Sequence, residues 1–198
     1  MVHVETVQEI VPVELVKKHL RLAHTEEDAY LEHLIRVARQ QLEHETGQIL
    51  RKAQVRFTVE RPPVGPDIYY KEGIRILKET PGLIWFQVPK YPVLAVESLE
   101  ACSKQGERRR LDPSQYHINR QRRPVLMAVD SSCLESLEVQ LQVGYDPAHP
   151  SSELASAQQA LLQCIELIYE NPEDIRLQAP GYEAVRMLVR PLMARRFL

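Results

Sequence analysis

The chain has 198 residues, of which 44% are hydrophobic and 26% are charged. This length and composition are those of a globular chain with its own apolar core, and they exclude collagen-like, mucin-like and wholly disordered proteins. The formal net charge is −2, but residues 124–175 hold nine acidic side chains and no Lys or Arg, whereas residues 104–123 and 176–198 are basic. The sequence therefore predicts unlike charged surfaces on one molecule.

The cysteines, Cys102, Cys133 and Cys164, are an odd number, and the chain opens with no apolar leader segment. We therefore expect a reducing compartment and no disulfide framework. No apolar run approaches the roughly 18 residues of a membrane span. These features predict a protein that is assembled in a cytosol and has no membrane partner.

Two helices are predicted near the start of the chain. Pro12 opens a short one, and a longer one of about six turns begins at a capping-box-like pair, Thr25 and Asp28, and ends at Gly47. Arg39 and Glu43 are expected off the apolar face of the longer helix. That apolar face consists of Leu31, Leu34, Ile35, Ala38 and Leu42.

The middle of the chain predicts strands. Residues 55–59 alternate between apolar and polar side chains, as in a strand with one buried face. Residues 61–66 hold three prolines and one glycine, which favour an exposed loop. Further strands are predicted at residues 74–77, 83–88, 93–101, 116–119, 125–129 and 137–145.

Helix returns after Ser151 or Ser152, either of which is a suitable N-cap. This helix ends at Asn171, because proline disfavours the helical conformation in the residue before it. A last helix begins near Tyr182 and is interrupted by Pro191.

The order of elements predicts an α+β fold, in which N- and C-terminal helices form a small helical bundle with an inserted antiparallel β-sheet region. We expect a single domain over residues 1–198. Its parts are helices at about 13–47 and 151–190, the β insertion at about 53–145 and a C-terminal docking tail at about 191–198.

The sequence contains no glycine-rich phosphate loop, no nucleophile elbow, no pair of helical histidines and no C-x-x-C spacing. It therefore predicts a protein that is not an enzyme and binds no cofactor and no metal.

Two arginine-rich segments are candidate contact sites. The first segment suits a subunit contact or a DNA contact, since arginines bind phosphates. The alternatives are a solvated hairpin rim and ion pairing with the acidic block of residues 124–175. It comprises Arg108, Arg109, Arg110, Arg122 and Arg123. The second mixes arginine with large apolar side chains, as interface anchors do, although a frayed terminus is the alternative. It comprises Arg190, Met193, Arg195, Arg196, Phe197 and Leu198.

Several stretches in a fixed order carry a family resemblance. They are Val13–Leu22 with Glu26–Gly47, Val88–Val93, Leu111–Asp112 with Tyr116–Ile118, Val139–Asp146 with Pro150 and Leu154–Ala160, and Tyr169–Asn171. With these stretches the chain resembles the tailed-phage head-to-tail connector, or adaptor, family. Gene transfer agents, which are phage-derived particles, use similar adaptors.

The resemblance implies a structural virion protein without catalytic residues. It implies a homo-oligomeric ring of about a dozen copies below the portal protein, linking the capsid to stopper or other neck and tail proteins. DNA would pass through the ring channel without sequence specificity. The protein would be assembled in the bacterial host cytoplasm and reside in the virion neck. The alternatives are a head-completion stopper, a tail-completion protein or a DNA-binding packaging accessory protein.

Within this scheme, residues 190–198 are predicted to be loose in the free protein and to become ordered on the portal. Deletion of residues 187–198 is then expected to leave a folded protein that no longer binds portal.

Overall fold

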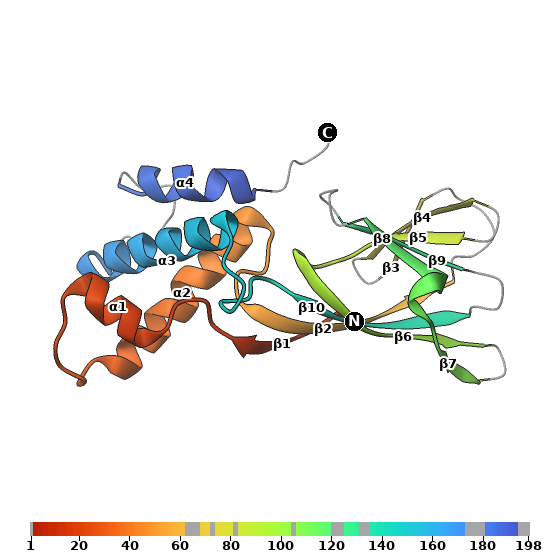
Figure 1. Cartoon of the computed structure of the whole chain (residues 1–198). Coiled ribbons are helices and arrows are strands. Elements are labelled where there is room, and N and C mark those ends of the chain that lie inside the picture. The colour runs from red at the N-terminus through yellow and green to blue at the C-terminus, as the bar shows by residue number, and fades with distance from the viewer. Residues whose placement is uncertain are drawn as a thin grey trace. The chain divides into compact units, whose positions relative to one another are not determined.

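The computed structural model describes residues 2–61, 68–71, 74–80, 83–103, 106–119, 125–130, 135–172 and 181–193 (Figure 1). These residues form helices and two antiparallel sheets, which confirms the α+β class. The chain divides into two compact units. The sheet unit comprises Met1–Val7 and Ala53–Gly144, and the helical unit comprises Gln8–Lys52 and Tyr145–Leu198.

The helical unit is built from helices that come from both sides of the sheet unit in the sequence. Its elements are α1 (Val13–Leu20), α2 (Asp28–Thr46), α3 (Ser152–Glu170), α4 (Glu183–Val189) and the 3-10 turn Arg190–Leu192. Helix α3 packs against both α2 and α4, as Figure 1 shows. Their apolar faces form one core that includes Leu42, Leu161 and Leu192.

Local sequence signals explain most helix ends. Ser151 caps α3, because its Oγ accepts a hydrogen bond of 3.0 Å from the Leu154 amide. Gly47 ends α2 with a φ of 68°, a conformation that glycine adopts without strain. The predicted capping box of Thr25 and Asp28 is wrong. Helix α2 begins at Asp28 without a side-chain cap, and the Asp28 carboxylate accepts a bond of 2.8 Å from Lys17 instead.

The prediction that Arg39 and Glu43 avoid the buried side of α2 is also wrong. Arg39 is only 5% exposed, and the side chain of Glu43 is 13% exposed. Both are tolerated in the interior because they pair with each other, one turn apart, at 3.1 Å.

The sheet unit contains two five-stranded sheets. The first has the order β1 (His3–Gln8), β2 (Lys52–Glu60), β10 (Ser136–Val143), β6 (Val93–Cys102) and β7 (Arg108–Arg110). The second has the order β3 (Ile68–Lys71), β4 (Ile74–Thr80), β5 (Leu83–Gln87), β9 (Leu126–Asp130) and β8 (Tyr116–Asn119). Strands β1 and β2 each extend one residue into the helical unit.

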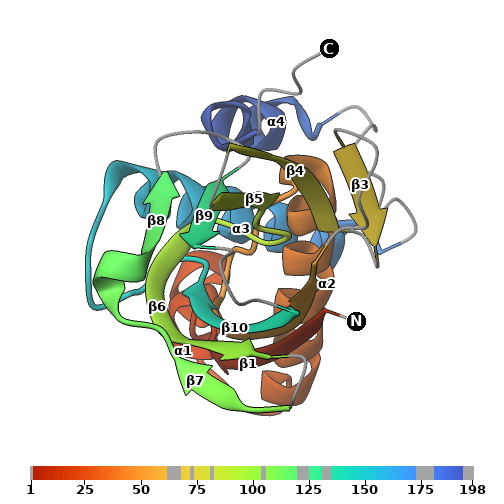
Figure 2. The same cartoon turned by 90° about the vertical axis from the view of Figure 1, so that its right-hand side faces the viewer.

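An apolar layer joins the two sheets. In the first sheet Phe57 lies opposite Val139, and Val139 lies opposite Leu99, so the three buried side chains share one face. The ring of Phe57 meets that of Phe86 from the second sheet, edge to face, with centroids 6.2 Å apart. The sheets therefore stack face to face, and Figure 2 shows β4, β5 and β9 above β10.

The longer predicted strands are present, but three short ones were not predicted. Strands β1, β3 and β7 all lie at sheet edges, where the alternation of apolar and polar residues is weak. Because β1 precedes α1, the helices do not begin the chain. Apart from Arg61, the predicted loop at 61–66 lies outside the described residues.

Candidate interaction surfaces

The first arginine segment forms β7, at one edge of the first sheet. Arg110 lies opposite Glu100, and Arg108 lies opposite Cys102, whereas Arg109 lies opposite Ala101. Successive residues of a strand face opposite sides, so Arg108 and Arg110 share one face and Arg109 points to the other. The three arginines therefore do not form one cluster.

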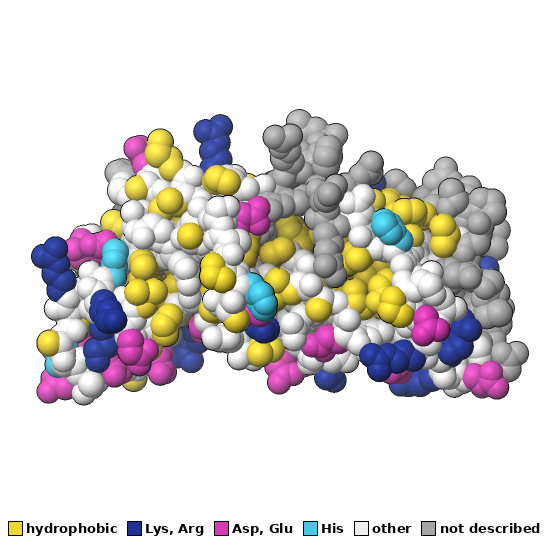
Figure 3. Space-filling model, in the orientation of Figure 1, with side chains coloured by type: hydrophobic (Ala, Val, Ile, Leu, Met, Phe, Trp, Pro, Cys, Tyr) yellow, Lys and Arg dark blue, Asp and Glu magenta, His cyan; other side chains and the backbone are white. Residues whose placement is uncertain are grey.

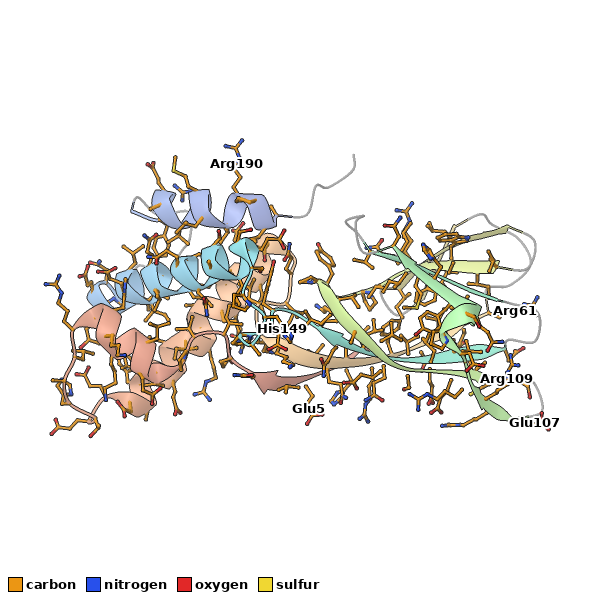
Figure 4. All side chains as sticks on the ribbon, in the orientation of Figure 1. Glu5, Arg61, Glu107, Arg109, His149 and Arg190 are labelled. Carbon is orange, nitrogen blue, oxygen red and sulfur yellow. The ribbon has the colours of Figure 1, made fainter. Side chains whose placement is uncertain are left out.

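The two arginines on the same face have partners within the sheet. Arg108 Nη1 lies 3.3 Å from Glu138 Oε2, and Arg110 Nη2 donates to the Glu97 carbonyl oxygen at 2.7 Å. Both side chains of the Arg108–Glu138 pair are well exposed, so this pair contributes at most about 1 kcal/mol. Arg109, labelled in Figure 4, is exposed and has no partner among the described residues. Arg122 and Arg123 lie outside the described residues.

A hydrogen-bonded polar network covers the face of the first sheet that carries Arg108. A shift in the β6–β10 register skips Glu97, and the carboxylate of this bulged residue accepts from three glutamine amides. Gln140 donates at 2.8 Å and Gln142 at 3.1 Å, and Gln54 from β2 is the third donor. This network fixes the outer side chains of three neighbouring strands.

A hollow of about 310 Å³ lies beside this network. Its lining contains both basic and acidic side chains. Figure 3 shows Lys and Arg (dark blue) interspersed with Asp and Glu (magenta) along the lower margin of the view. Its lining residues are His3, Arg56, Phe57, Thr58, Ser98, Glu100, Glu138, Val139 and Gln140. No group of His, Cys, Asp and Glu suited to a metal ion occurs among the residues that the structure describes.

The second arginine segment begins at the end of the helical unit. Arg190 is exposed and points away from α4, as Figure 4 shows, and Met193 is half-buried. Arg195, Arg196, Phe197 and Leu198 lie outside the described residues. Met187, on α4, is 76% exposed.

The start of this segment belongs to the core. Val189 is 1% exposed and Leu192 is fully buried, so both contribute to helix packing. A deletion from residue 187 would remove these core side chains and destabilise the helical unit. A loss of portal binding by that variant would therefore not show that the tail docks on the portal. A deletion of residues 194–198 leaves the described core intact.

The acidic block of residues 124–175 is shared between the two units. Glu138 lies on β10, whereas Asp146 and Glu166 lie in the helical unit. Glu166 Oε2 lies 3.0 Å from His19 Nε2, which links α3 to α1. A run of one charge sign in the sequence is therefore divided between two structural units.

Among the described carboxyls of that block, Asp146 has the most strongly shifted pKa. Lys52 Nζ lies 2.7 Å from its Oδ2, and the Ala148 amide donates to its Oδ1 at 3.0 Å. The hydrogen bond from Lys52, followed by that from Ala148, lowers the pKa of Asp146 from 3.8 to about 2. This arrangement fixes the connection between β10 and α3.

A buried ionic network was not foreseen from the sequence. Arg39 lies 3.1 Å from Glu9 and from Glu43, and Glu43 also lies 3.0 Å from Arg51. The Leu50 amide donates to Glu43 Oε1 at 2.9 Å. These contacts join the segment before α1, helix α2 and the segment that leads into β2.

The two cysteines that the structure describes are free thiols. Cys164 on α3 is buried, and burial raises the pKa of its thiol to about 12, so it remains protonated at neutral pH. Cys102 is half-buried and free, and Cys133 lies outside the described residues. Among the described helices, none is long and apolar enough to cross a membrane.

Two comparisons with known proteins found similarities. Residues 11–80 match the family model described as "Phage gp6-like head-tail connector protein". No curated protein sequence matches the chain.

The solved structures with a similar fold belong to gene transfer agent (GTA) particles. A chain in "Virion of native gene transfer agent (GTA) particle" matches with a TM-score of 0.66 and 19% identity, over 100% of this chain and 97% of that one. A chain in "Neck of empty GTA particle computed with C6 symmetry" matches with a TM-score of 0.64 and 18% identity, over 99% and 97%. A chain in "Neck of native GTA particle computed with C12 symmetry" matches with a TM-score of 0.62 and 18% identity, also over 99% and 97%.

At these identities the structural matches show a shared fold, and the family model adds a sequence match over the N-terminal part. The predicted resemblance to head-to-tail connector proteins is thus confirmed, by the connector family model over residues 11–80 and by a fold shared with chains of gene transfer agent particles over nearly the whole length.

Proposed function

We propose that this protein is a structural head-to-tail connector, which forms a ring below the portal and links the capsid to the neck and tail. The observation that carries the proposal is the agreement of two comparisons. The family-model match to head-tail connectors and the fold shared with GTA neck chains both support a structural connector role in a virion.

The proposal includes a ring formed by copies of this chain. The related necks were computed with C6 and C12 symmetry, which supports a ring of copies of this chain. A ring requires that two different surfaces of each copy meet. The exposed Arg109 and the polar face around Glu97 belong to a sheet that offers such unlike surfaces.

The proposal also assigns binding partners to the ring. We assign the portal protein to the C-terminal segment from Arg190 onward, which includes Arg195, Arg196, Phe197 and Leu198, and stopper or other neck and tail proteins to the opposite side of the ring. DNA passes through the channel without sequence specificity. The protein acts as one connector domain of bundled helices with an inserted sheet region, is assembled in the host cytoplasm, and has no enzymatic activity.

Binding to purified portal protein from the same particle tests the proposal. The full chain is expected to bind portal, and a chain lacking residues 194–198 is expected to bind at least about tenfold more weakly, because the deletion removes two arginines and two large apolar side chains. A full chain that does not bind portal would overturn the connector proposal. A truncated chain that binds as well as the full chain would overturn the assignment of the tail.

A DNA mobility-shift assay separates the connector from the DNA-binding alternative. A connector is expected to give no shift of double-stranded DNA at physiological ionic strength. A salt-dependent shift that disappears when Arg108, Arg109 and Arg110 are replaced by alanine would favour the packaging accessory protein instead.

A further inference from the structure

The side chain of Gln48 is almost completely buried and is hydrogen-bonded at both ends. Its Oε1 accepts a bond of 2.7 Å from the Tyr145 hydroxyl, and its Nε2 donates to the carbonyl oxygen of Leu192. Gln48, Tyr145 and Leu192 are 1%, 5% and 0% exposed. The three residues therefore form a closed polar contact inside the apolar core of the helical unit.

This contact joins three separate parts of the chain. Gln48 follows the left-handed Gly47 at the end of α2, and Tyr145 lies between β10 and α3. Leu192 ends the 3-10 turn that follows α4. The last carbonyls of a helix have no partner within it, so an outside donor is required when they are buried. Gln48 is such a donor for Leu192.

Met193 is the last residue of the C-terminal part that the structure describes. The Met193 amide donates to the carbonyl oxygens of Val189 and Arg190, at 3.1 and 3.3 Å, and residues 194–198 follow. The Gln48 contact is therefore the last buried polar anchor in the described chain before the arginine-rich C-terminal residues.

We propose that Gln48 is a positioning residue for docking: it fixes the backbone at Leu192, from which the chain continues into the C-terminal segment. This inference rests on the proposed function, in which that segment binds portal. A segment whose first residues are held in place loses less conformational freedom on binding than one whose first residues can move. Gln48 then strengthens docking without contacting the partner.

The amide of Gln48 is the chemical group that this role needs. A carboxylate at this position would place a negative charge against the Leu192 carbonyl oxygen, and a thioether would remove the donor that Gln48 supplies. Two variants therefore release the contact in different ways: Gln48→Glu adds a repulsion, and Gln48→Met removes the bonds with little change in side-chain volume.

Gln158 supplies a matched control. Its Nε2 donates to the Ile10 carbonyl oxygen at 2.9 Å, which anchors the segment before α1 to α3 by the same kind of bond. Gln158→Glu and Gln158→Met thus make the same chemical changes at an anchor that does not hold the C-terminal segment.

Two measurements are made on the full-length chain and its variants. Hydrogen exchange of the Met193 and Val189 amides reports the local stability at the start of the C-terminal segment, here called its root. Exchange of the α2 amides reports the stability of the helical fold. Both Gln48 variants are expected to raise exchange at the root by about tenfold or more, with α2 within about threefold of wild type. Binding to immobilised portal protein is expected to weaken by about tenfold. Both Gln158 variants are expected to leave root exchange and portal binding unchanged.

The outcomes separate this inference from the proposed function. Unchanged root exchange in Gln48→Met, or faster exchange with unchanged portal binding, overturns the positioning role while leaving the connector proposal in place. Equal losses of binding in the Gln48 and Gln158 variants also overturn it, because they would indicate a general loss of stability. Absence of binding by the wild-type chain overturns the proposed function, and the docking role of Gln48 with it.

Discussion

The helical unit and the sheet unit place their polar side chains differently. In the helical unit Arg39, Glu43 and Gln48 lie inside, where they hold segment ends against the helices. In the sheet unit the comparable network around Glu97 lies on an outer face, and the interior between the sheets is apolar around Phe57 and Phe86.

The difference matters for assembly. Buried polar contacts require partners with defined geometry, so those of the helical unit fix how segments enter and leave it. The network around Glu97 is half-buried on an outer face, so its side chains remain partly accessible to a partner. The comparison indicates that the helical unit fixes the orientation of segments, whereas the sheet unit presents a polar surface.

The two units can be followed separately in one molecule. The single tryptophan, Trp85, lies on β5 in the sheet unit, so its fluorescence reports that unit. Circular dichroism at helical wavelengths reports chiefly the helical unit. Because two units need not unfold together, both signals are recorded for each variant.

The largest expected effect comes from breaking the buried ionic network. Arg39→Ala removes the guanidinium that pairs with both Glu9 and Glu43, so the free energy of unfolding of the helical unit is expected to fall by about 3–5 kcal/mol. Urea denaturation followed by circular dichroism measures this change. Arg36→Ala, at an exposed position of the same helix, is the control and is expected to have little effect. Equal, small effects of both variants would show that the network does not stabilise the unit.

A smaller effect is expected from the apolar layer of the sheet unit. Phe57→Leu keeps an apolar side chain but removes the edge-to-face contact with Phe86, and we expect a loss of about 1–2 kcal/mol. Trp85 fluorescence during urea denaturation detects it, while the helical signal stays unchanged. A parallel shift of both signals would contradict the separation into two units.

A pH-dependent effect is expected at Asp146. Its pKa is about 2 in the folded chain, below its ordinary value of 3.8, so the ionised carboxylate stabilises the fold. This contribution is present above pH 4 and is lost as the pH falls towards 2. Asp146→Asn is therefore expected to lower the melting temperature at pH 7 and to have a much smaller effect near pH 2. Glu135→Gln changes an exposed residue of the same acidic block and is the control. An Asp146→Asn effect that is as large at pH 2 as at pH 7 would contradict the ion pair with Lys52.

The smallest effect on stability is expected at the edge of the first sheet. Arg108→Ala removes an exposed ion pair with Glu138 and is expected to change the free energy of unfolding by less than about 1 kcal/mol. Replacement of Arg108, Arg109 and Arg110 by glutamate is expected to block ring formation without loss of helicity. Rings that still form, observed by electron microscopy, would remove this edge from the subunit interface.

Much of the fold was predictable because local signals agreed with it. Ser151 and Gly47 mark helix ends through specific hydrogen bonds or backbone angles, and alternation in residues 55–59 matches the buried face of β2. Three of the four edge strands, β1, β3 and β7, were not predicted, since a strand such as β7 gains its structure from pairing with β6 rather than from its own side chains.

The contact residues were less predictable than the fold. The three consecutive arginines suggested one cluster, but strand geometry places Arg109 on the face opposite to Arg108 and Arg110. Gln48 carried no signal, because a glutamine after a helix-ending glycine is ordinary in sequence. Its role depends on Tyr145 and Leu192, which lie far away along the chain.

Imaging a mixture of the purified protein and its portal by electron microscopy tests the connector role most directly. We expect a ring of this chain stacked on the portal, and no such ring when residues 194–198 are deleted. A chain that remains monomeric beside unoccupied portals, even at high concentrations of both proteins, would contradict the connector role.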